Sequence, residues 1–151
     1  MQPTNCEEVL DLTLKNLQLL IQETGTSISR DPLPTVLGDR SQLLQLWQNL
    51  LTNAIKYRSE KNPTIKIGAE AQKNRWLFYI QDNGIGIDVQ YFERIFAIFQ
   101  RLHTREEYPG TGIGLAICQK IVNRHGGKIW VESKLGQGAI FYFTIPVTEA
   151  E

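Results

Sequence analysis

The chain has 151 residues, with 16 basic and 16 acidic side chains and a formal net charge of zero. This length and a hydrophobic fraction of 42% are typical of one globular domain and exclude bulk disorder. The balanced charge argues against a protein whose main work is binding nucleic acid, because such proteins carry an excess of basic residues. We therefore expect a single domain with no nucleic-acid partner.

The two cysteines, Cys6 and Cys118, form no CxxC pair and no Cys/His cluster, so metal binding through thiolates is not expected. A reduced, cytoplasmic setting suits such cysteines best. The first residues are neither basic nor followed by an apolar core, which argues against a signal peptide. No apolar run approaches the length of about 18 residues that a membrane-spanning helix needs, so we expect no membrane segment.

The first part of the chain predicts two helices and a short strand. Apolar residues at helical spacing predict a helix over residues 7–23, stopped by Gly25, with a short strand before it as an open alternative. Residues 26–29 predict a strand, and residues 31–34 a rigid connector, because proline restricts itself and its predecessor. Asp39 and Gln42 have the spacing of a capping box, which opens a second helix that extends to about Tyr57.

The second part predicts two pairs of strands separated by helices. Strands are expected over residues 64–71 and 76–81 around a turn at 72–75, and over 128–133 and 139–146 around the turn Gly136-Gln137-Gly138. Between these pairs we expect a glycine-rich segment at 82–87, a helix at 89–99, a polar loop at 100–112 and a helix at 113–125. Strands paired without a helix between them favour a largely antiparallel sheet with helices on one face. The patterns GxGxxG and GxxxxGK[ST] are both absent, which argues against a doubly wound nucleotide-binding fold.

The second predicted helix carries a polar stripe of Gln45, Asn49, Asn53 and Lys56 beside its apolar one. Asn49 and Asn53 are four residues apart and share a face. A carboxamide oxygen is a neutral hard ligand that suits Mg²⁺, which takes few protein ligands together with phosphates and waters. Lys56 is placed to meet a phosphate. The alternative is a solvated polar face of the helix.

A second candidate segment, residues 82–87, directly follows a predicted apolar strand. The Asp82 carboxylate is suited to accept hydrogen bonds from an amine. Gly84 and Gly86 would let the backbone approach a flat ligand, while Ile85 and Ile87 are suited to form an apolar wall. The alternative is an ordinary Asn-Gly turn with a charge beside it.

A third candidate segment, residues 110–115, opens the predicted helix at 113–125. Glycines at a helix start expose amide donors, and a helix N-terminus favours phosphate. Arg101, His103 and Arg105 lie upstream, where they either approach phosphates or form a solvated basic loop. A mobile loop followed by a helix start is the alternative for the glycines.

Taken in order, residues 49–57, 82–86, 96–101 and 110–115 resemble the asparagine, first glycine, phenylalanine and second glycine boxes of sensor histidine kinases. Gly136-Gln137-Gly138 resembles their last glycine box. The resemblance covers about residues 3–147, and the run from residue 99 to 112 is most similar to kinases of the cyanobacterial and bacterial phytochrome type. It implies one ATP-binding catalytic domain over residues 1–147 and a tail over 148–151.

The resemblance also implies a fold and two cofactors, ATP and Mg²⁺. The fold is the α/β two-layer sandwich shared with gyrase, Hsp90 and MutL, in which about three helices cover one face of a mixed, mostly antiparallel sheet. Asp82 would accept a hydrogen bond from the adenine amino group, and Asn53 would bind Mg²⁺. Residues 100–112 would form the ATP lid.

The remaining implied site residues surround the phosphates and the ribose. Asn49 and Lys56 would lie near the phosphates, Tyr57 near the ribose or base, and Arg101 near the terminal phosphate, so that Asn49, Lys56 and Arg101 are the expected catalytic residues. The further nucleotide contacts that the resemblance implies are Gly84, Gly86, Ile87, Gly110, Thr111, Gly112, Ile113, Gly114 and Leu115.

The departures from the family concern the phosphate acceptor. Histidine kinases phosphorylate a histidine in an HE- or HD-type motif, whereas His103 and His125, the only histidines of this chain, have no such context. We therefore expect a fragment of a larger kinase, with a natural truncation as the alternative. The expected partners are the dimerisation and histidine phosphotransfer domain of the same kinase and, indirectly, a response regulator. Ala139 also stands where the family often has Ser or Thr.

Asn49 bears on the type of reaction. Relatives that hydrolyse ATP have a glutamate at this position as a base for water, and a carboxamide has no useful basicity. The expected activity is therefore transfer of the terminal phosphate to a histidine on another domain. Two alternatives stay open: a serine-directed kinase of the anti-sigma-factor type, and a nucleotide-gated interaction module without catalysis.

Overall fold

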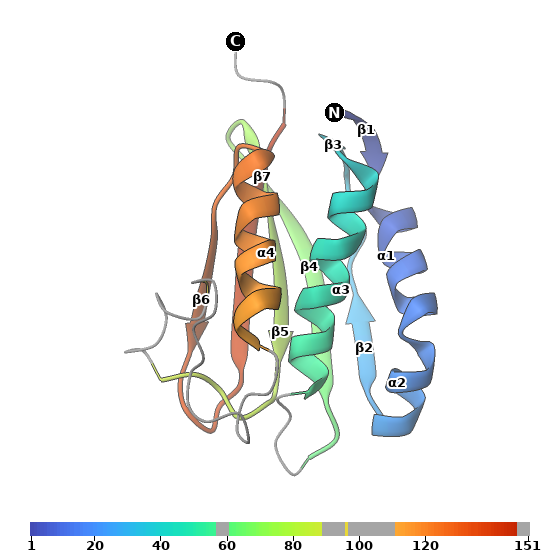
Figure 1. The fold of residues 1–151 in the computed structure, drawn as a ribbon, viewed down its shortest axis with the longest axis vertical. Helices are drawn as coiled ribbons and strands as arrows, with labels where there is room; N and C mark the ends of the chain where they lie inside the picture. The colour runs from blue at the N-terminus through green and yellow to red at the C-terminus, as the bar shows by residue number, and fades with distance from the viewer. Residues whose placement is uncertain (57–60, 89–95, 97–110, 148–151) are drawn as a thin grey trace.

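The structure, a computed structural model, describes residues 1–56, 61–88, 96 and 111–147, with the backbone alone for residues 111–114. Figure 1 shows the helices packed side by side in front of a sheet. The elements are β1 (Gln2–Asn5), α1 (Cys6–Asn16), α2 (Gln18–Thr24), β2 (Ser27–Arg30), β3 (Thr35–Gly38), α3 (Arg40–Lys56), β4 (Thr64–Gln72), β5 (Arg75–Asp82), α4 (Thr111–Arg124), β6 (Ile129–Ser133) and β7 (Ala139–Pro146).

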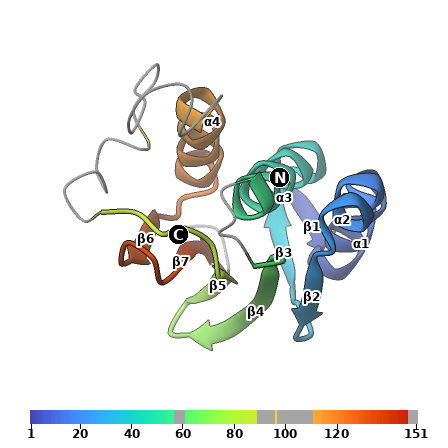
Figure 2. The same ribbon diagram turned by 90° about the horizontal axis from the view of Figure 1, so that it is seen from below.

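The main sheet has five strands in the order β2-β4-β5-β7-β6. β2 runs parallel to β4, and every other neighbouring pair is antiparallel. β1 and β3 form a separate antiparallel pair. Figure 2 shows the sheet curving beneath helices that all lie on one side of it, which confirms the predicted two-layer α/β sandwich with a mixed, mostly antiparallel sheet.

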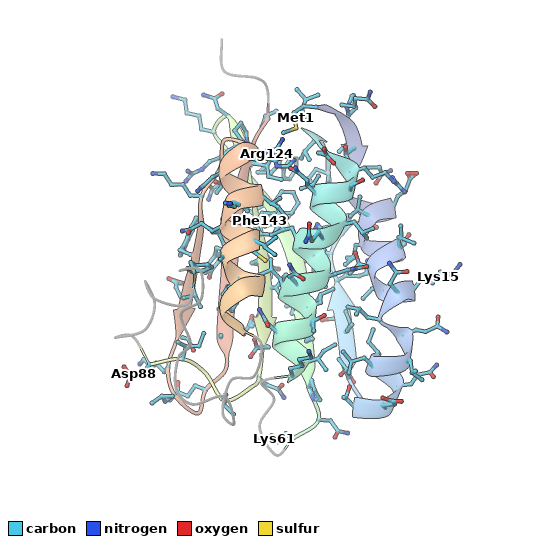
Figure 3. The ribbon with its side chains drawn as sticks, viewed as in Figure 1. Met1, Lys15, Lys61, Asp88, Arg124 and Phe143 are labelled. Atoms are coloured by element: carbon cyan, nitrogen blue, oxygen red, sulfur yellow. The ribbon has the colours of Figure 1, made fainter. Side chains whose placement is uncertain are left out.

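The core between the two layers is built on three aromatic side chains. Trp47 of α3 meets Phe78 and Phe143 edge-on, with ring centroids 6.0 and 5.3 Å away. Phe78 and Phe143 are directly paired on β5 and β7 and stack at 4.9 Å. All three are fully buried, and Figure 3 labels Phe143 at the level of the middle of α4. This apolar contact fixes α3 over the middle of the sheet.

The helix predicted over residues 7–23 is two helices, α1 and α2. α1 ends at Asn16, Leu17 departs from helical geometry, and α2 begins at Gln18. The Leu17 amide still donates to Thr13, and the Ile21 amide donates to the Leu17 carbonyl. The junction is therefore a bend that keeps its hydrogen bonds, which is why helical spacing continues through it.

The other differences lie at short or terminal segments. The short strand before the first helix is present as β1, and its partner β3 was not predicted. The predicted turn at 72–75 narrows to Lys73-Asn74, where Asn74 has a φ of 62°, as tight hairpin turns require. α4 begins at Thr111, within the predicted loop, and ends at Arg124. Apart from Phe96, the helix predicted at 89–99 lies outside the described residues, as do residues 100–110 of the loop and the tail at 148–151.

The predicted capping box at the start of α3 is half formed. The Gln42 amide donates to Asp39 Oδ1 at 3.1 Å, as the pattern requires. The Asp39 amide, however, donates to Nε2 of the buried His125, and Nδ1 of that ring lies 2.8 Å from the Ile121 carbonyl oxygen. His125 therefore joins the end of α4 to the start of α3. Among the helices that the structure describes, none is long and apolar enough to span a membrane.

Candidate active site

The end of α3, the start of α4 and the end of β5 lie at the same end of the molecule. α3 and α4 are neighbours and run in opposite directions, so that the end of α3 lies beside the start of α4 at the lower end in Figure 1. β5 also finishes at this end, at Asp82. The fold thus brings together the three segments that the sequence singled out, although α3 and α4 begin about 70 residues apart along the chain.

The asparagine stripe of α3 is not a solvated face over its whole length. Asn49 and Asn53 are half-buried, whereas Lys56 at the helix end is exposed. The Asn49 side chain acts on the buried Cys118 thiol of α4, where it opposes the rise that burial causes in the pKa of that thiol. Nδ2 of Asn53 is buried and has no hydrogen-bond partner in the described part of the chain. Such an unsatisfied amide is costly to bury, and it is the feature that a bound ligand relieves.

Asp82 is held by the backbone around it. Its Oδ1 accepts hydrogen bonds from the Gly84 amide at 2.8 Å and from the Ala139 amide at 3.2 Å. Within the described residues, Oδ2 has no hydrogen-bond partner. Burial raises the pKa of Asp82 from its ordinary value of 3.8 to about 6, and the two amide bonds oppose that rise. The carboxylate is therefore oriented, largely ionised at neutral pH and able to accept one more donor.

The loop that follows Asp82 lies against the β6–β7 hairpin. Gly136 donates its amide to the Ile85 carbonyl at 2.6 Å, and Ile87 donates its amide to Ser133 Oγ at 2.7 Å. Gly86 has a φ of 78°, and a Cβ on it would lie 2.1 Å from the Lys134 carbonyl oxygen. From the sequence we expected Gly86 to let the backbone approach a ligand. The structure gives a second reason for glycine at this position, which is its close contact with the hairpin. The Ile87 side chain is part of the buried core.

The second glycine segment opens α4. Residues 111–114 form its first turn, and the first four amides of any helix have no partner inside it. The backbone of this turn is therefore suited to bind an anion. Leu115 is buried in the core, so only its backbone is available to a ligand. Gly110, Tyr57 and Arg101, like His103 and Arg105, lie outside the described residues, and their predicted contacts stay predictions.

Two residues around Asp82 escaped the sequence analysis. Asn83 accepts a hydrogen bond from the Thr64 amide at 2.9 Å and donates to the Asn62 carbonyl at 3.2 Å, which ties the loop to the start of β4. Ser133 binds Ile87 from a position 46 residues further along the chain. Asn83 directly follows Asp82 and begins an Asn-Gly pair, and this pair could have pointed to Asn83 as a turn residue. No spacing pattern could have pointed to Ser133.

Comparison with known proteins agrees with this geometry. Residues 38–149 match the profile of the family described as histidine kinase-, DNA gyrase B- and HSP90-like ATPases. The chain belongs to this ATPase family. The match includes α3, β5, α4 and the β6–β7 hairpin, which are the elements that build the candidate site.

The similar proteins include a phytochrome and a sensory kinase. The chain is 62% identical to cyanobacterial phytochrome A of Nostoc sp. over 146 residues. This match covers 97% of this chain and 19% of that protein. The chain is 41% identical over 149 residues to the adaptive-response sensory kinase SasA of Prochlorococcus marinus, covering 97% of this chain and 39% of that protein. The chain thus spans about a fifth of the length of this phytochrome. The sequence resemblance to sensor histidine kinases is confirmed.

Solved structures give the same result. The catalytic domain of the histidine kinase ThkA has a TM-score of 0.82 and 31% identity, and the match covers 97% of both chains. A full-length structure of ShkA in complex with AMPPNP has a TM-score of 0.81 and 32% identity, covering 98% of this chain and 31% of that one. Coverage of 97% leaves too few residues unmatched to omit α1 or α2, so this ATPase family member shares nearly all of its fold with the catalytic domain of ThkA.

Proposed function

We propose that this chain is the Mg·ATP-binding catalytic domain of a sensor histidine kinase, extending over residues 1–147 with a tail at 148–151. The observation that carries the proposal is the Asp82 carboxylate, which two amides hold through Oδ1 at the end of β5. An adenine base presents an exocyclic amino group, and an ionised carboxylate is an acceptor for it. We propose that Oδ2 of Asp82 accepts this hydrogen bond.

The residues of α3 fit a magnesium ion. A carboxamide carries an acceptor oxygen and a donor nitrogen, so Asn53 would offer Oδ1 to the cation, while its buried, unpartnered Nδ2 would donate to an oxygen of the same Mg·ATP. Mg²⁺ accepts neutral oxygen ligands and usually keeps phosphate oxygens and waters as well. When bound, it would neutralise phosphate charge during transfer. Asn53 is the proposed ligand, and Asn49 is one helical turn away.

The phosphates would lie between the ends of two helices. The first-turn amides at residues 111–114 would donate to phosphate oxygens, and Leu115 would add its backbone amide. Lys56, which is exposed and is the last residue of α3, would bring a positive charge to the same phosphates. Gly110, Tyr57 and Arg101 complete the proposed site from the sequence pattern alone. The structure of ShkA with AMPPNP supports nucleotide binding by this fold in that relative.

The phosphate acceptor is proposed to be a histidine on a separate dimerisation domain. His125 cannot serve, because it is buried and both ring nitrogens make hydrogen bonds to the backbone. Asn49 provides no base for water, so transfer to an external nucleophile is favoured over hydrolysis. A structure of ThkA in complex with the response regulator TrrA, at 29% identity and a TM-score of 0.77, supports a response regulator as the indirect partner. A cytoplasmic location fits this role.

Transfer of labelled phosphate tests the proposal. The chain is incubated with γ-labelled ATP and Mg²⁺, with and without an added cognate domain that carries the proposed phosphate-accepting histidine. We expect label on the added domain only, and we expect that label to be lost in acid, as phosphohistidine is. Acid-stable label would favour the serine-directed alternative. ATP binding with no transfer to any authentic partner would favour the interaction module.

A further inference from the structure

Asp82, Ala139 and Ser133 are neighbours in one row across three strands of the sheet. Asp82 of β5 is paired with Ala139 of β7, and Ala139 is paired with Ser133 of β6. Directly paired residues in a sheet place their side chains on the same face. The row therefore joins the proposed adenine-binding carboxylate to a hydroxyl on the edge strand, to which the proposed function assigns no role.

The Ser133 hydroxyl makes two hydrogen bonds. It donates to the Gly138 carbonyl oxygen at 2.5 Å and accepts from the Ile87 amide at 2.7 Å. A hydroxyl carries one donor and two acceptor sites, so both bonds form at once. Ser133 is half-buried, and water competes only partly for these bonds. The hydroxyl therefore links the start of β7 to the far end of the loop that begins at Asp82.

The bond to Gly138 bears directly on Asp82. The Gly138 carbonyl and the Ala139 amide belong to a single planar peptide group. Ser133 holds its oxygen, and Asp82 Oδ1 accepts from its N–H at 3.2 Å. Because the group is rigid, a rotation that breaks one of these bonds also displaces the other. Hydrogen bonds in series also strengthen each other by polarisation.

We propose that Ser133 is a positioning residue for base recognition, which acts through the Gly138–Ala139 peptide to set the direction in which Asp82 presents its second carboxylate oxygen. This inference rests on the proposed function, because it takes the adenine amino group as the partner of Asp82. In this role Ser133 acts through the peptide and needs no contact of its own with the nucleotide. Its effect is on the choice of base, which separates it from residues that bind phosphate or magnesium.

Other contacts hold the hairpin against the loop without Ser133. Gly136 donates to the Ile85 carbonyl at 2.6 Å, and the Gly86 backbone lies directly against Lys134. The β6–β7 pairing also continues from Ser133 back to Ile129. Loss of the hydroxyl should therefore change the direction of the Asp82 carboxylate more than it changes the fold.

The test compares two nucleotides that differ at the base. ATP carries the adenine amino group, whereas inosine triphosphate (ITP) carries an oxygen at that position. Both affinities are measured by competition against a fluorescent nucleotide for the parent chain, Ser133→Ala and Ser133→Thr. Ser29→Ala is the matched control, because Ser29 is an exposed serine on β2, at the opposite edge of the sheet.

We expect Ser133→Ala to bind ATP about threefold to tenfold more weakly, the range for loss of one hydrogen bond, with ITP affinity unchanged within about twofold. Ser133→Thr keeps the hydroxyl and should keep the parent ratio of ATP to ITP affinity, as should Ser29→Ala. An equal loss for both nucleotides, or an unchanged ratio in Ser133→Ala, would overturn the inference. If Ser133→Ala does not fold, Ser133→Cys, with a similar volume and a weak donor, must show the lowered ratio instead.

The parent chain separates this inference from the proposed function. A parent that binds ATP and ITP equally would overturn the role of Asp82 and, with it, the role of Ser133. If the parent prefers ATP and Ser133→Ala has the same ratio of ATP to ITP affinity as the parent, the role of Ser133 alone would be overturned.

Discussion

The Asp39 amide donates to Nε2 of His125 at 3.0 Å, across 86 residues of sequence. The same ring lies 2.8 Å from the Ile121 carbonyl through Nδ1, so the imidazole links the last turn of α4 to the first residue before α3. Gly38 leaves room for this ring, since a Cβ there would lie 3.1 Å from Nε2. The histidine is therefore part of the scaffold that sets α3 beside α4.

Replacing His125 should affect stability and leave the chemistry intact. His125→Ala leaves the Asp39 amide without its acceptor and opens a small cavity, which should lower the free energy of unfolding by about 1–3 kcal/mol. Phosphate transfer to an added dimerisation domain should continue at a similar rate below the unfolding temperature. Denaturant unfolding measures the first effect. The control is Asn123→Ala, at an exposed position on the same helix, and complete loss of transfer in folded His125→Ala would contradict the structural role.

Substitution of Asp82 should weaken nucleotide binding and stabilise the free protein. Asp82→Asn places a donor where the adenine amino group needs an acceptor, and a buried unpaired donor costs about 1–3 kcal/mol, or roughly tenfold to a hundredfold in ATP affinity. At pH 8 the parent holds an ionised carboxylate in a site that disfavours its charge. The variant should therefore unfold at a higher temperature at pH 8 without nucleotide. Calorimetry measures both quantities, and unchanged ATP affinity would refute the adenine assignment.

The same carboxylate predicts a pH dependence of stability with an unusual sign for an aspartate. Because the pKa of Asp82 is about 6 in the folded chain and 3.8 ordinarily, the folded state binds more protons between these values. Its contribution to stability is therefore greatest below pH 3.8, falls as pH rises to 6, and is constant above that, with a total change of at most about 3 kcal/mol. The stability difference between Asp82→Asn and the parent should accordingly shrink from pH 8 to pH 4. A difference that stays constant over this range would contradict the shifted pKa.

Asn53→Ala should separate metal binding from base binding. Removal of the amide removes the proposed Mg²⁺ ligand, while the Asp82 site is untouched, so binding of ADP without Mg²⁺ should stay within about twofold of the parent. The gain in ATP affinity that Mg²⁺ gives to the parent should be lost. Titrations with Mg²⁺ and with a chelator provide the comparison. An equal collapse of ADP binding without metal would make Asn53 a structural residue.

Two glycines offer a matched pair for the contact between loop and hairpin. Gly86 and Gly136 have φ values of 78° and 79°, so alanine is strained by about 1–2 kcal/mol at either position. A Cβ at Gly136 meets nothing within 4 Å, whereas one at Gly86 would lie 2.1 Å from the Lys134 carbonyl oxygen. Gly136→Ala should therefore be mildly destabilised. Gly86→Ala should lose more stability and, because the Asp82 loop must shift, should also lose ATP affinity. Equal effects of the two substitutions would argue against this close contact.

Local pattern determined the chemistry-bearing segments of this protein. Three features could be recognised from residues that lie close together in the sequence. They are the polar stripe on α3, the carboxylate at the end of β5 and the glycines at the start of α4. Apolar periodicity likewise predicted most of the elements, and the succession of strands without helices between them predicted a mostly antiparallel sheet. Because these features depend on residues that are neighbours in the sequence, they can be predicted from the sequence alone.

Only the tertiary structure decided how these segments are held. The pairing of β1 with β3, the link from His125 to Asp39 and the contact of Ser133 with Ile87 each join residues far apart in the chain. Such contacts leave no periodic trace, because a single hydrogen bond constrains one residue and not a run of them. The Asp82 carboxylate shows the division most clearly: its position at a strand end is local, but the Ala139 amide that orients it comes from 57 residues away, through the pairing of β5 with β7.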